Sequence, residues 1–315
     1  MTLSPQPVPP ELDAAGQPHW QIQADRIRNA LDVLPDKPSE TVESTLSTLW
    51  HLAAGMPLSC EAAAERPLPR LDAAGLERLD ALVRERVAGR PLAHMTGRQR
   101  FMSLEMIAGP GALIPRRESE LLARTALHLM AETPAKHSDP IAIDVCTGSG
   151  NIALAIAHAL PGYHVHASDL SANAVELARQ NASALGLASR VTLHVGDLFE
   201  PLIAAGLAGQ AILVTCNPPY VSSARVPNMA PEIASHEPSL AFDGGPFGIS
   251  ILRRTIREAP LLLAPGGWLV LEVGLGQGQS VLHSLRASSQ YADVAGVEDT
   301  EGNVRVVLGR RIDRT

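Results

Sequence analysis

From about residue 118 onwards, short apolar segments alternate with segments of helical periodicity, and this alternation most constrains the fold. Strands are predicted over 141–145, 164–168, 191–195, 211–216, 268–273, 294–298 and 304–308. Helices are predicted over 118–131, 152–159, 172–185 and 248–263. Strands that alternate with helices form a parallel sheet with helices on both faces. We therefore expect residues 118–315 to form an α/β domain, doubly wound around seven strands.

The chain before residue 118 has a different pattern. Residues 1–17 are rich in proline and polar residues, which is typical of a disordered leader. Residues 18–89 have apolar side chains at helical spacing and predict a small helical domain. Residues 90–117 predict a β-hairpin linker, because an alternating stretch over 101–107 precedes a Gly-Pro-Gly turn and a second apolar stretch over 112–114.

Composition excludes several kinds of protein. Lys and Arg number 26 against 33 Asp and Glu, so the net charge is −7. A protein that binds nucleic acid through its phosphates usually has a basic excess. No uncharged apolar run approaches the roughly 20 residues of a membrane span, and the three cysteines lack zinc-site spacing. We therefore expect a cytoplasmic protein with reduced thiols, no metal and no membrane contact.

A glycine-containing loop follows the first strand of the α/β domain. Glycines let a backbone turn tightly and approach a ligand closely. The loop does not have the Gly-x-Gly-x-x-Gly spacing of a pyrophosphate cradle, nor the Gly-Lys-Ser/Thr ending of a P-loop. Its pattern instead suits a nucleoside with a short charged tail, such as S-adenosylmethionine. The residues expected to bind it here are Asp144, Cys146, Thr147, Gly148, Ser149 and Gly150.

Two further acidic residues follow the next two strands. Asp169 stands about where a ribose-binding acid is found, and its carboxylate can accept hydrogen bonds from ribose hydroxyls. Asp197 can accept from the amine of adenine, while Leu198 or Phe199 packs on the ring. Each Asp could instead be a helix N-cap. Because candidate ligand-binding residues follow three successive strands, the interpretation as a cofactor site is favoured over helix capping.

The fourth strand leads into Asn217-Pro218-Pro219-Tyr220, which we call the shelf. The two prolines fix two φ angles and make a rigid segment at the carboxyl edge of the sheet. An amide nitrogen is a poor nucleophile, and the Asn217 side-chain oxygen and the Pro218 carbonyl can accept both hydrogens of a substrate NH2. Tyr220 can pack on the flat group. We expect Asn217, Pro218 and Tyr220 to act in catalysis by positioning and electrostatics, and all four shelf residues to bind substrate. Asn217 is also expected to contact the cofactor.

These motifs together resemble the class I (Rossmann-like) methyltransferases that act on exocyclic or amide nitrogen. The stretch Leu113-Ile114-Pro115-Arg116 with Glu118-Ser119-Glu120 resembles Ile-Pro-Arg-Pro-x-Thr-Glu of the HemK-type protein-(glutamine-N5) methyltransferases. Further similar segments lie within 89–101, 237–248 and 265–307. The resemblance implies a seven-stranded sheet, S-adenosylmethionine as cofactor, and a contribution of Phe101 to substrate binding. It also implies that the acceptor is a glutamine of a translation protein.

Two branches of this family remain open. One methylates the Gly-Gly-Gln loop of peptide-chain release factors, and the other methylates a large-subunit ribosomal protein. Cys146 stands where the release-factor branch usually has Gly, and Arg117 replaces the usual Pro. Ile114-Pro115-Arg116 and the length of the helical domain nevertheless favour a release factor, and so a role in translation termination.

Other classes of protein explain the sequence less well. An adenine-N6 nucleic-acid methyltransferase shares the Asn-Pro-Pro-Tyr motif but needs a recognition domain, and base flipping for a duplex substrate. An interaction module that had lost its catalytic activity would not be expected to keep a suitable residue at every ligand-binding position.

Overall fold

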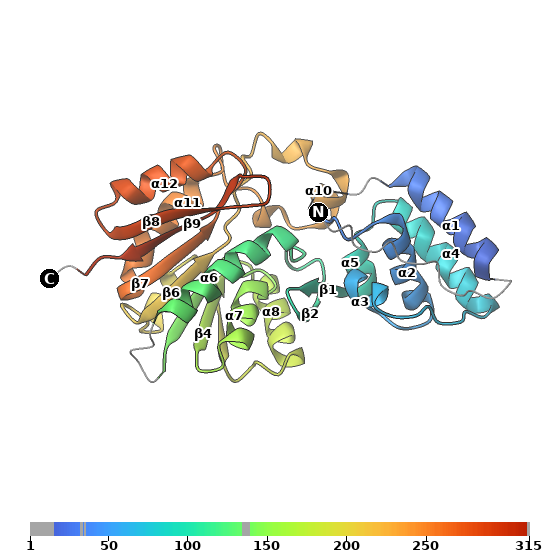
Figure 1. Ribbon diagram of the computed structural model, residues 1–315, viewed down its shortest axis with the longest axis horizontal. Coiled ribbons are helices and arrows are strands. Elements are labelled where there is room, and N and C mark those ends of the chain that lie inside the picture. The colour runs from blue at the N-terminus through green and yellow to red at the C-terminus, as the bar shows by residue number, and fades with distance from the viewer. Residues whose placement is uncertain (1–15, 32–33, 35, 134–138, 314–315) are drawn as a thin grey trace. The chain divides into compact units, whose positions relative to one another are not determined.

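The computed structural model describes residues 16–31, 34, 36–133 and 139–313 (Figure 1). The chain divides into two compact units. The first comprises Met1–Pro110 together with Pro231–His236, and the second comprises Gly111–Ala230 with Glu237–Thr315. The predicted leader lies outside the described residues, except for Gly16 and Gln17, which begin the first helix.

The first unit is built mainly from helices, as its periodicity predicted. Three of them begin at an N-cap, Thr41, Ser59 or Asp72, whose side chain accepts a backbone N–H three residues further on. Apolar side chains including Trp50 and Leu79 form its core. The helices are α1 (Gly16–Ala30), α2 (Val42–Ala53), α3 (Cys60–Ala64), α4 (Ala73–Val87), α5 (Leu92–Thr96) and α10 (Pro231–His236).

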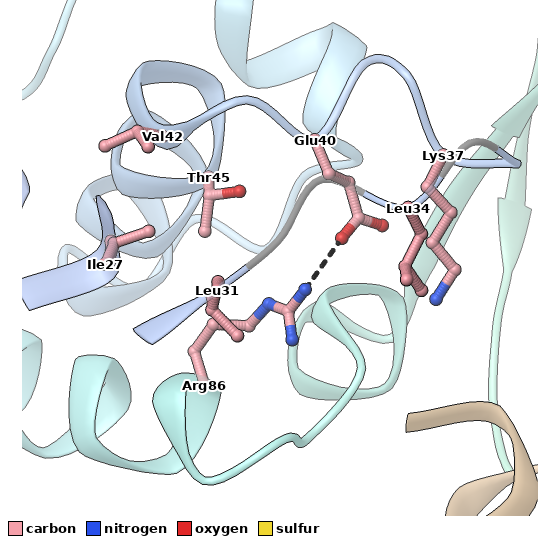
Figure 2. A pocket seen from close by; sticks show the side chains of 8 residues that line it. All are labelled: Ile27, Leu31, Leu34, Lys37, Glu40, Val42, Thr45 and Arg86. Atoms are coloured by element: carbon pink, nitrogen blue, oxygen red, sulfur yellow. Dashed lines mark hydrogen bonds and ion pairs between the residues drawn. The ribbon is translucent and has the colours of Figure 1, made fainter. Parts of the chain in front are cut away.

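A small cavity lies within the first unit (Figure 2). Its volume is about 10 Å³, roughly the space of one water molecule. Arg86 Nη2 lies 3.1 Å from Glu40 Oε2, the contact drawn in Figure 2. Arg86 and Lys37 also form ion pairs with Glu232 of α10. Because the cavity is so small and its charges are paired, we assign it a structural role.

The β-hairpin lies earlier in the chain than the sequence predicted. Strands β1 (Arg98–Phe101) and β2 (Leu104–Ile107) pair antiparallel around the two residues Met102 and Ser103. The Gly-Pro-Gly segment follows the hairpin, and residues 112–114 form no strand. The prediction of a hairpin turn at Gly-Pro-Gly was wrong because the real turn contains neither glycine nor proline. Met102 takes the left-handed conformation itself, with φ 53°.

The second unit contains a seven-stranded sheet in the order β5-β4-β3-β6-β7-β9-β8. The first five strands of this order are parallel, as predicted, but β9 pairs antiparallel with both β7 and β8. Only residues 299–303 connect β8 to β9, and a parallel crossover needs about a dozen residues or more. The strands are β3 (Ile141–Val145), β4 (His164–Asp169), β5 (Val191–Val195), β6 (Ala211–Cys216), β7 (Leu263–Glu272), β8 (Tyr291–Glu298) and β9 (Val304–Arg311).

Helices cover both faces of this sheet. The order of α6, α7 and α8 along one face can be followed in Figure 1, and right-handed crossovers place α9, α11 and α12 on the other. Helix α11 ends at Glu258, short of the predicted 263, because Pro260 lacks the N–H that the helix needs. The helices are α6 (Glu120–Glu132), α7 (Asn151–Ala159), α8 (Ala172–Ala184), α9 (Glu200–Ala204), α11 (Ser250–Glu258) and α12 (Gly278–Ala287), with 3-10 turns η1 (Arg117–Ser119), η2 (Val226–Asn228), η3 (Ser239–Ala241) and η4 (Ala259–Leu261).

The strand order indicates where on the sheet a ligand is expected to bind. From β3 the chain moves outwards through β4 to β5 and then returns to β6, on the other side of β3. Open α/β sheets bind ligands at the carboxyl ends of the strands beside such a reversal. The loops after β3, β4, β5 and β6 therefore meet there.

Among the described residues, no helix has the length and apolar character to cross a membrane.

Candidate active site

A cavity of about 160 Å³ lies at the carboxyl ends of β3, β4, β5 and β6. Each of these strand ends contributes residues that the sequence predicted. They are Cys146 and Gly148 after β3, Asp169 at the end of β4, Asp197 and Leu198 after β5, and Asn217 and Pro219 after β6. The fold thus brings together residues that are more than seventy positions apart in the chain.

The loop after β3 has a backbone that favours glycine. Gly148 and Gly150 have φ values of 55° and 83°, and Cys146 has φ 57°. A Cβ on Gly150 would lie 3.1 Å from the Cβ of Ala178 and 3.2 Å from Leu154 Cδ1. For a residue that has a side chain, the left-handed conformation is unfavourable in free energy. Cys146 therefore adopts a backbone conformation that Gly would adopt without strain.

Asp144 supports this loop from beneath. Its side chain is fully buried and accepts hydrogen bonds from Thr147 Oγ1 at 2.6 Å and Thr215 Oγ1 at 2.7 Å. Burial raises the pKa of the Asp144 carboxyl to about 6. The lining of the cavity does not include Asp144, Thr147, Ser149 or Gly150. The structure gives them a supporting position, and their contact with a cofactor stays a prediction.

Asp169 both lines the cavity and organises it. Its Oδ2 accepts the backbone N–H of Gly148 at 2.8 Å, and its Oδ1 accepts that of Ser171 at 2.9 Å. Burial raises the pKa of the carboxyl. The N-cap of α8 is Ser171, not Asp169. A carboxylate has about four acceptor positions, so both oxygens of Asp169 retain the capacity to accept ribose hydroxyls.

The apolar wall of the cavity includes residues that the sequence analysis missed. Leu198 lines it, whereas the alternative, Phe199, is buried in the core. Asp197 lines it too, but its carboxylate forms an ion pair with Arg254 of α11. The missed residues with large aliphatic side chains are Leu113, Leu170, Leu240 and Ile251. Of these, Leu170 was detectable from its place directly after Asp169.

Asn217 is held in a defined orientation. Its Nδ2 donates a hydrogen bond to Ser119 Oγ at 3.0 Å. Within the described parts of the chain, no donor bonds to Asn217 Oδ1. Asn217 borders the cavity. The amide oxygen is therefore the part of this side chain that can accept a hydrogen bond from a substrate.

The backbone of the shelf is held by glycines and by Gln277. A Cβ on Gly248 would lie 2.2 Å from Tyr220 O, and one on Gly244 would lie 2.5 Å from Pro219 O. Gln277 Nε2 donates to Tyr220 O at 2.9 Å and to Gly248 O at 3.3 Å. Gln277 Oε1 accepts the N–H of Gly274 at 3.0 Å. Gln277 lies within the 265–307 range in which the sequence resembles the family, and the structure shows that it contacts the shelf.

The hydroxyl of Tyr220 lies among charged groups. It is 3.4 Å from Glu118 Oε1 and 3.3 Å from Glu272 Oε1. Arg305 Nη2 lies 2.9 Å from Glu118 Oε2. Burial raises the pKa of Tyr220 and raises that of Glu272 to about 7. Tyr220 is therefore a neutral phenol whose hydroxyl is anchored.

Three predicted substrate residues do not line the cavity, and one of them, Tyr220, lines a second cavity instead. Pro218 is buried between its neighbours in the shelf. Phe101 is buried at the end of β1, in the first unit. Their contact with substrate stays a prediction. Within the described ranges, no group of three or more His, Cys, Asp or Glu side chains is arranged to hold a metal ion.

Comparisons with known proteins point to the same chemistry. Residues 142–236 match the model of a family described as a methyltransferase domain. The release factor glutamine methyltransferase of Moorella thermoacetica is 40% identical over 80% of this chain and 88% of the relative. The enzyme of the same name from Bradyrhizobium diazoefficiens is 34% identical over 88% and 91%. The crystal structure of the hMettl16 catalytic domain with a 3′UTR hairpin has a TM-score of 0.52 at 15% identity, covers 73% of this chain and 83% of that chain, and shows a shared fold.

Proposed function

Because the chain belongs to the release factor glutamine methyltransferase family, we propose that it transfers a methyl group from S-adenosylmethionine to a glutamine side-chain amide of a peptide-chain release factor. The acceptor of this proposal is the glutamine of the Gly-Gly-Gln loop. One observation carries it: Ser119 orients the Asn217 amide, so that its oxygen remains as acceptor at the border of the Asp169 cavity.

The residues of that cavity fit the cofactor. Asp169 offers carboxylate oxygens to the ribose hydroxyls, and Gly148 brings main chain close to the charged tail. Leu198 and Ile251 provide apolar surface for the base. S-adenosylmethionine, when bound, supplies an electrophilic methyl group.

The shelf makes the amide nitrogen reactive by positioning it. The lone pair of a primary amide is delocalised, so the nitrogen attacks poorly unless it is oriented and its developing positive charge is stabilised. Asn217 Oδ1 and the Pro218 carbonyl accept the two N–H groups, and the Tyr220 ring supports the flat amide. Because Gln277 and Ser119 hold the shelf in place, these acceptors need little reorganisation during reaction.

The relatives favour a release factor over a ribosomal protein. Relatives with 34–40% identity across most of the chain bear the release factor name. The net charge of −7 is unfavourable for binding led by nucleic-acid phosphates. The proposed substrate places the enzyme in the cytoplasm.

The test is incubation of the enzyme with labelled S-adenosylmethionine and a purified bacterial release factor. Mass spectrometry should find a gain of about 14 daltons on the Gly-Gly-Gln glutamine, the net change when a methyl group replaces a hydrogen. The Asn217→Ala variant should bind the cofactor nearly as well as the parent enzyme, and its turnover should fall about 100-fold or more. Label on a ribosomal protein or on adenine, with an unmodified release factor, would contradict the proposal.

A further inference from the structure

A second and larger cavity begins where the shelf ends. Its volume is about 590 Å³, within the range of roughly 300–1,000 Å³ that is typical of ligand sites. Asn217 and Pro219 border the first cavity, whereas Tyr220 and the residue after it border the second. The complete lining is Glu118, Tyr220, Val221, Ser222, Arg225, Asn228, Met229, Phe247, Gly274, Leu275, Gly276, Gln277 and Arg305.

One wall of this cavity is held by paired polar groups. Arg305 pairs with Glu118 and donates from Nε to Val273 O at 3.1 Å. Tyr220 and Gln277 are held by the hydrogen bonds given above. A site whose walls are already ordered loses little entropy when a ligand binds.

The same cavity has exposed apolar side chains in its lining. Phe247 is 79% exposed and Leu275 is 61% exposed. Arg225 also lines the cavity, and its guanidinium has no carboxylate partner in the part of the chain that the structure describes. Single exposed apolar residues are ordinary on a protein surface, but an aromatic and an aliphatic side chain at one hollow are typical of a site that binds a partner.

We propose that this second cavity binds the polypeptide segment that adjoins the acceptor glutamine, an inference that rests on the proposed function. A glutamine presented to the shelf brings its neighbouring residues with it. The first cavity is assigned to the cofactor, and the second cavity is a hollow next to the shelf that can hold these residues. An apolar side chain of the segment packs on Phe247 and Leu275, and Arg225 donates hydrogen bonds to main-chain carbonyls.

The occupant is a polypeptide because the lining combines two chemistries. Apolar contacts suit a neighbouring side chain, and the donors of Arg225 suit the carbonyls of an extended main chain. These contacts supply binding energy at a distance from the reacting nitrogen. An enzyme that acts on one glutamine of a large protein uses such binding energy to position that glutamine.

The test compares Phe247→Ala, Leu275→Ser and the double variant with Leu261→Ser. Leu261 is a matched control, because it is 56% exposed and lines neither cavity. Methylation of the purified release factor should show a KM raised about tenfold by each cavity substitution, the scale of a truncated interface residue. We expect kcat at saturating release factor and the cofactor dissociation constant to stay within about twofold.

The outcomes separate this inference from the function on which it rests. A release factor that the parent enzyme leaves unlabelled overturns the proposed function and this inference with it. A labelled release factor with an unchanged KM in the double variant overturns this inference alone. So does an equal rise in KM for Leu261→Ser, or a loss that lies only in kcat.

Discussion

Replacing Gln277 by Ala tests whether the shelf must be held rigid for catalysis. The substitution removes two donated hydrogen bonds, to Tyr220 O at 2.9 Å and Gly248 O at 3.3 Å, and one accepted from Gly274 at 3.0 Å. A hydrogen bond contributes about 0.5–1.5 kcal/mol net. Two bonds of good geometry and one weaker bond therefore amount to about 2–3 kcal/mol of positional stabilisation.

The catalytic cost follows if that stabilisation is needed in the transition state. A loss of about 2–3 kcal/mol lowers kcat roughly 30- to 150-fold. The cofactor dissociation constant should change by less than about twofold, because Asp169 and the glycine loop belong to other strand ends.

The assay is steady-state methylation of the release factor, with calorimetry of cofactor binding on the same preparations. Gln210→Ala is the matched control, because Gln210 Nε2 also donates to a main-chain carbonyl, that of Gly206, and lines neither cavity. The control should keep the parent kcat. A Gln277→Ala enzyme with kcat within twofold of the parent, or one whose loss lies in cofactor affinity, would refute the reasoning.

Three further predictions follow from the site. Asp169→Ala should weaken S-adenosylmethionine binding by about 1.5–3 kcal/mol, and calorimetry showing an unchanged dissociation constant would exclude Asp169 as the ribose ligand. Cys146→Gly should raise the free energy of unfolding by up to about 1 kcal/mol in urea titrations, because φ 57° strains a residue with a Cβ; a loss of stability would show that the packing of the thiol outweighs that strain. Glu272 has its pKa raised from 4.5 to about 7, so the folded state binds the extra proton and the stability from this group is lost as pH rises from 4.5 to about 7. Glu272→Gln should therefore gain stability over the parent at pH 8 relative to pH 5, and thermal unfolding with the same difference at both pH values would contradict this.

The local sequence determined much of the second unit. Period-two apolar segments and helical stretches predicted its strands and helices, because each pattern records which face of an element is buried. The loop that contains Gly148 and the rigid segment at the shelf prolines could be predicted from the sequence for a similar reason. Tight turns and fixed φ angles restrict which residues can stand there.

Contacts between distant parts of the chain were decided only by the tertiary structure. The antiparallel pairing of β9 depends on which strands lie side by side. The ion pair of Arg254 with Asp197 and the contact of Gln277 with the shelf join residues more than fifty positions apart. The Met102 turn was missed because it contains neither glycine nor proline. Sequence patterns report the conformation and burial of each segment, whereas the partners of a side chain depend on how the packed segments meet.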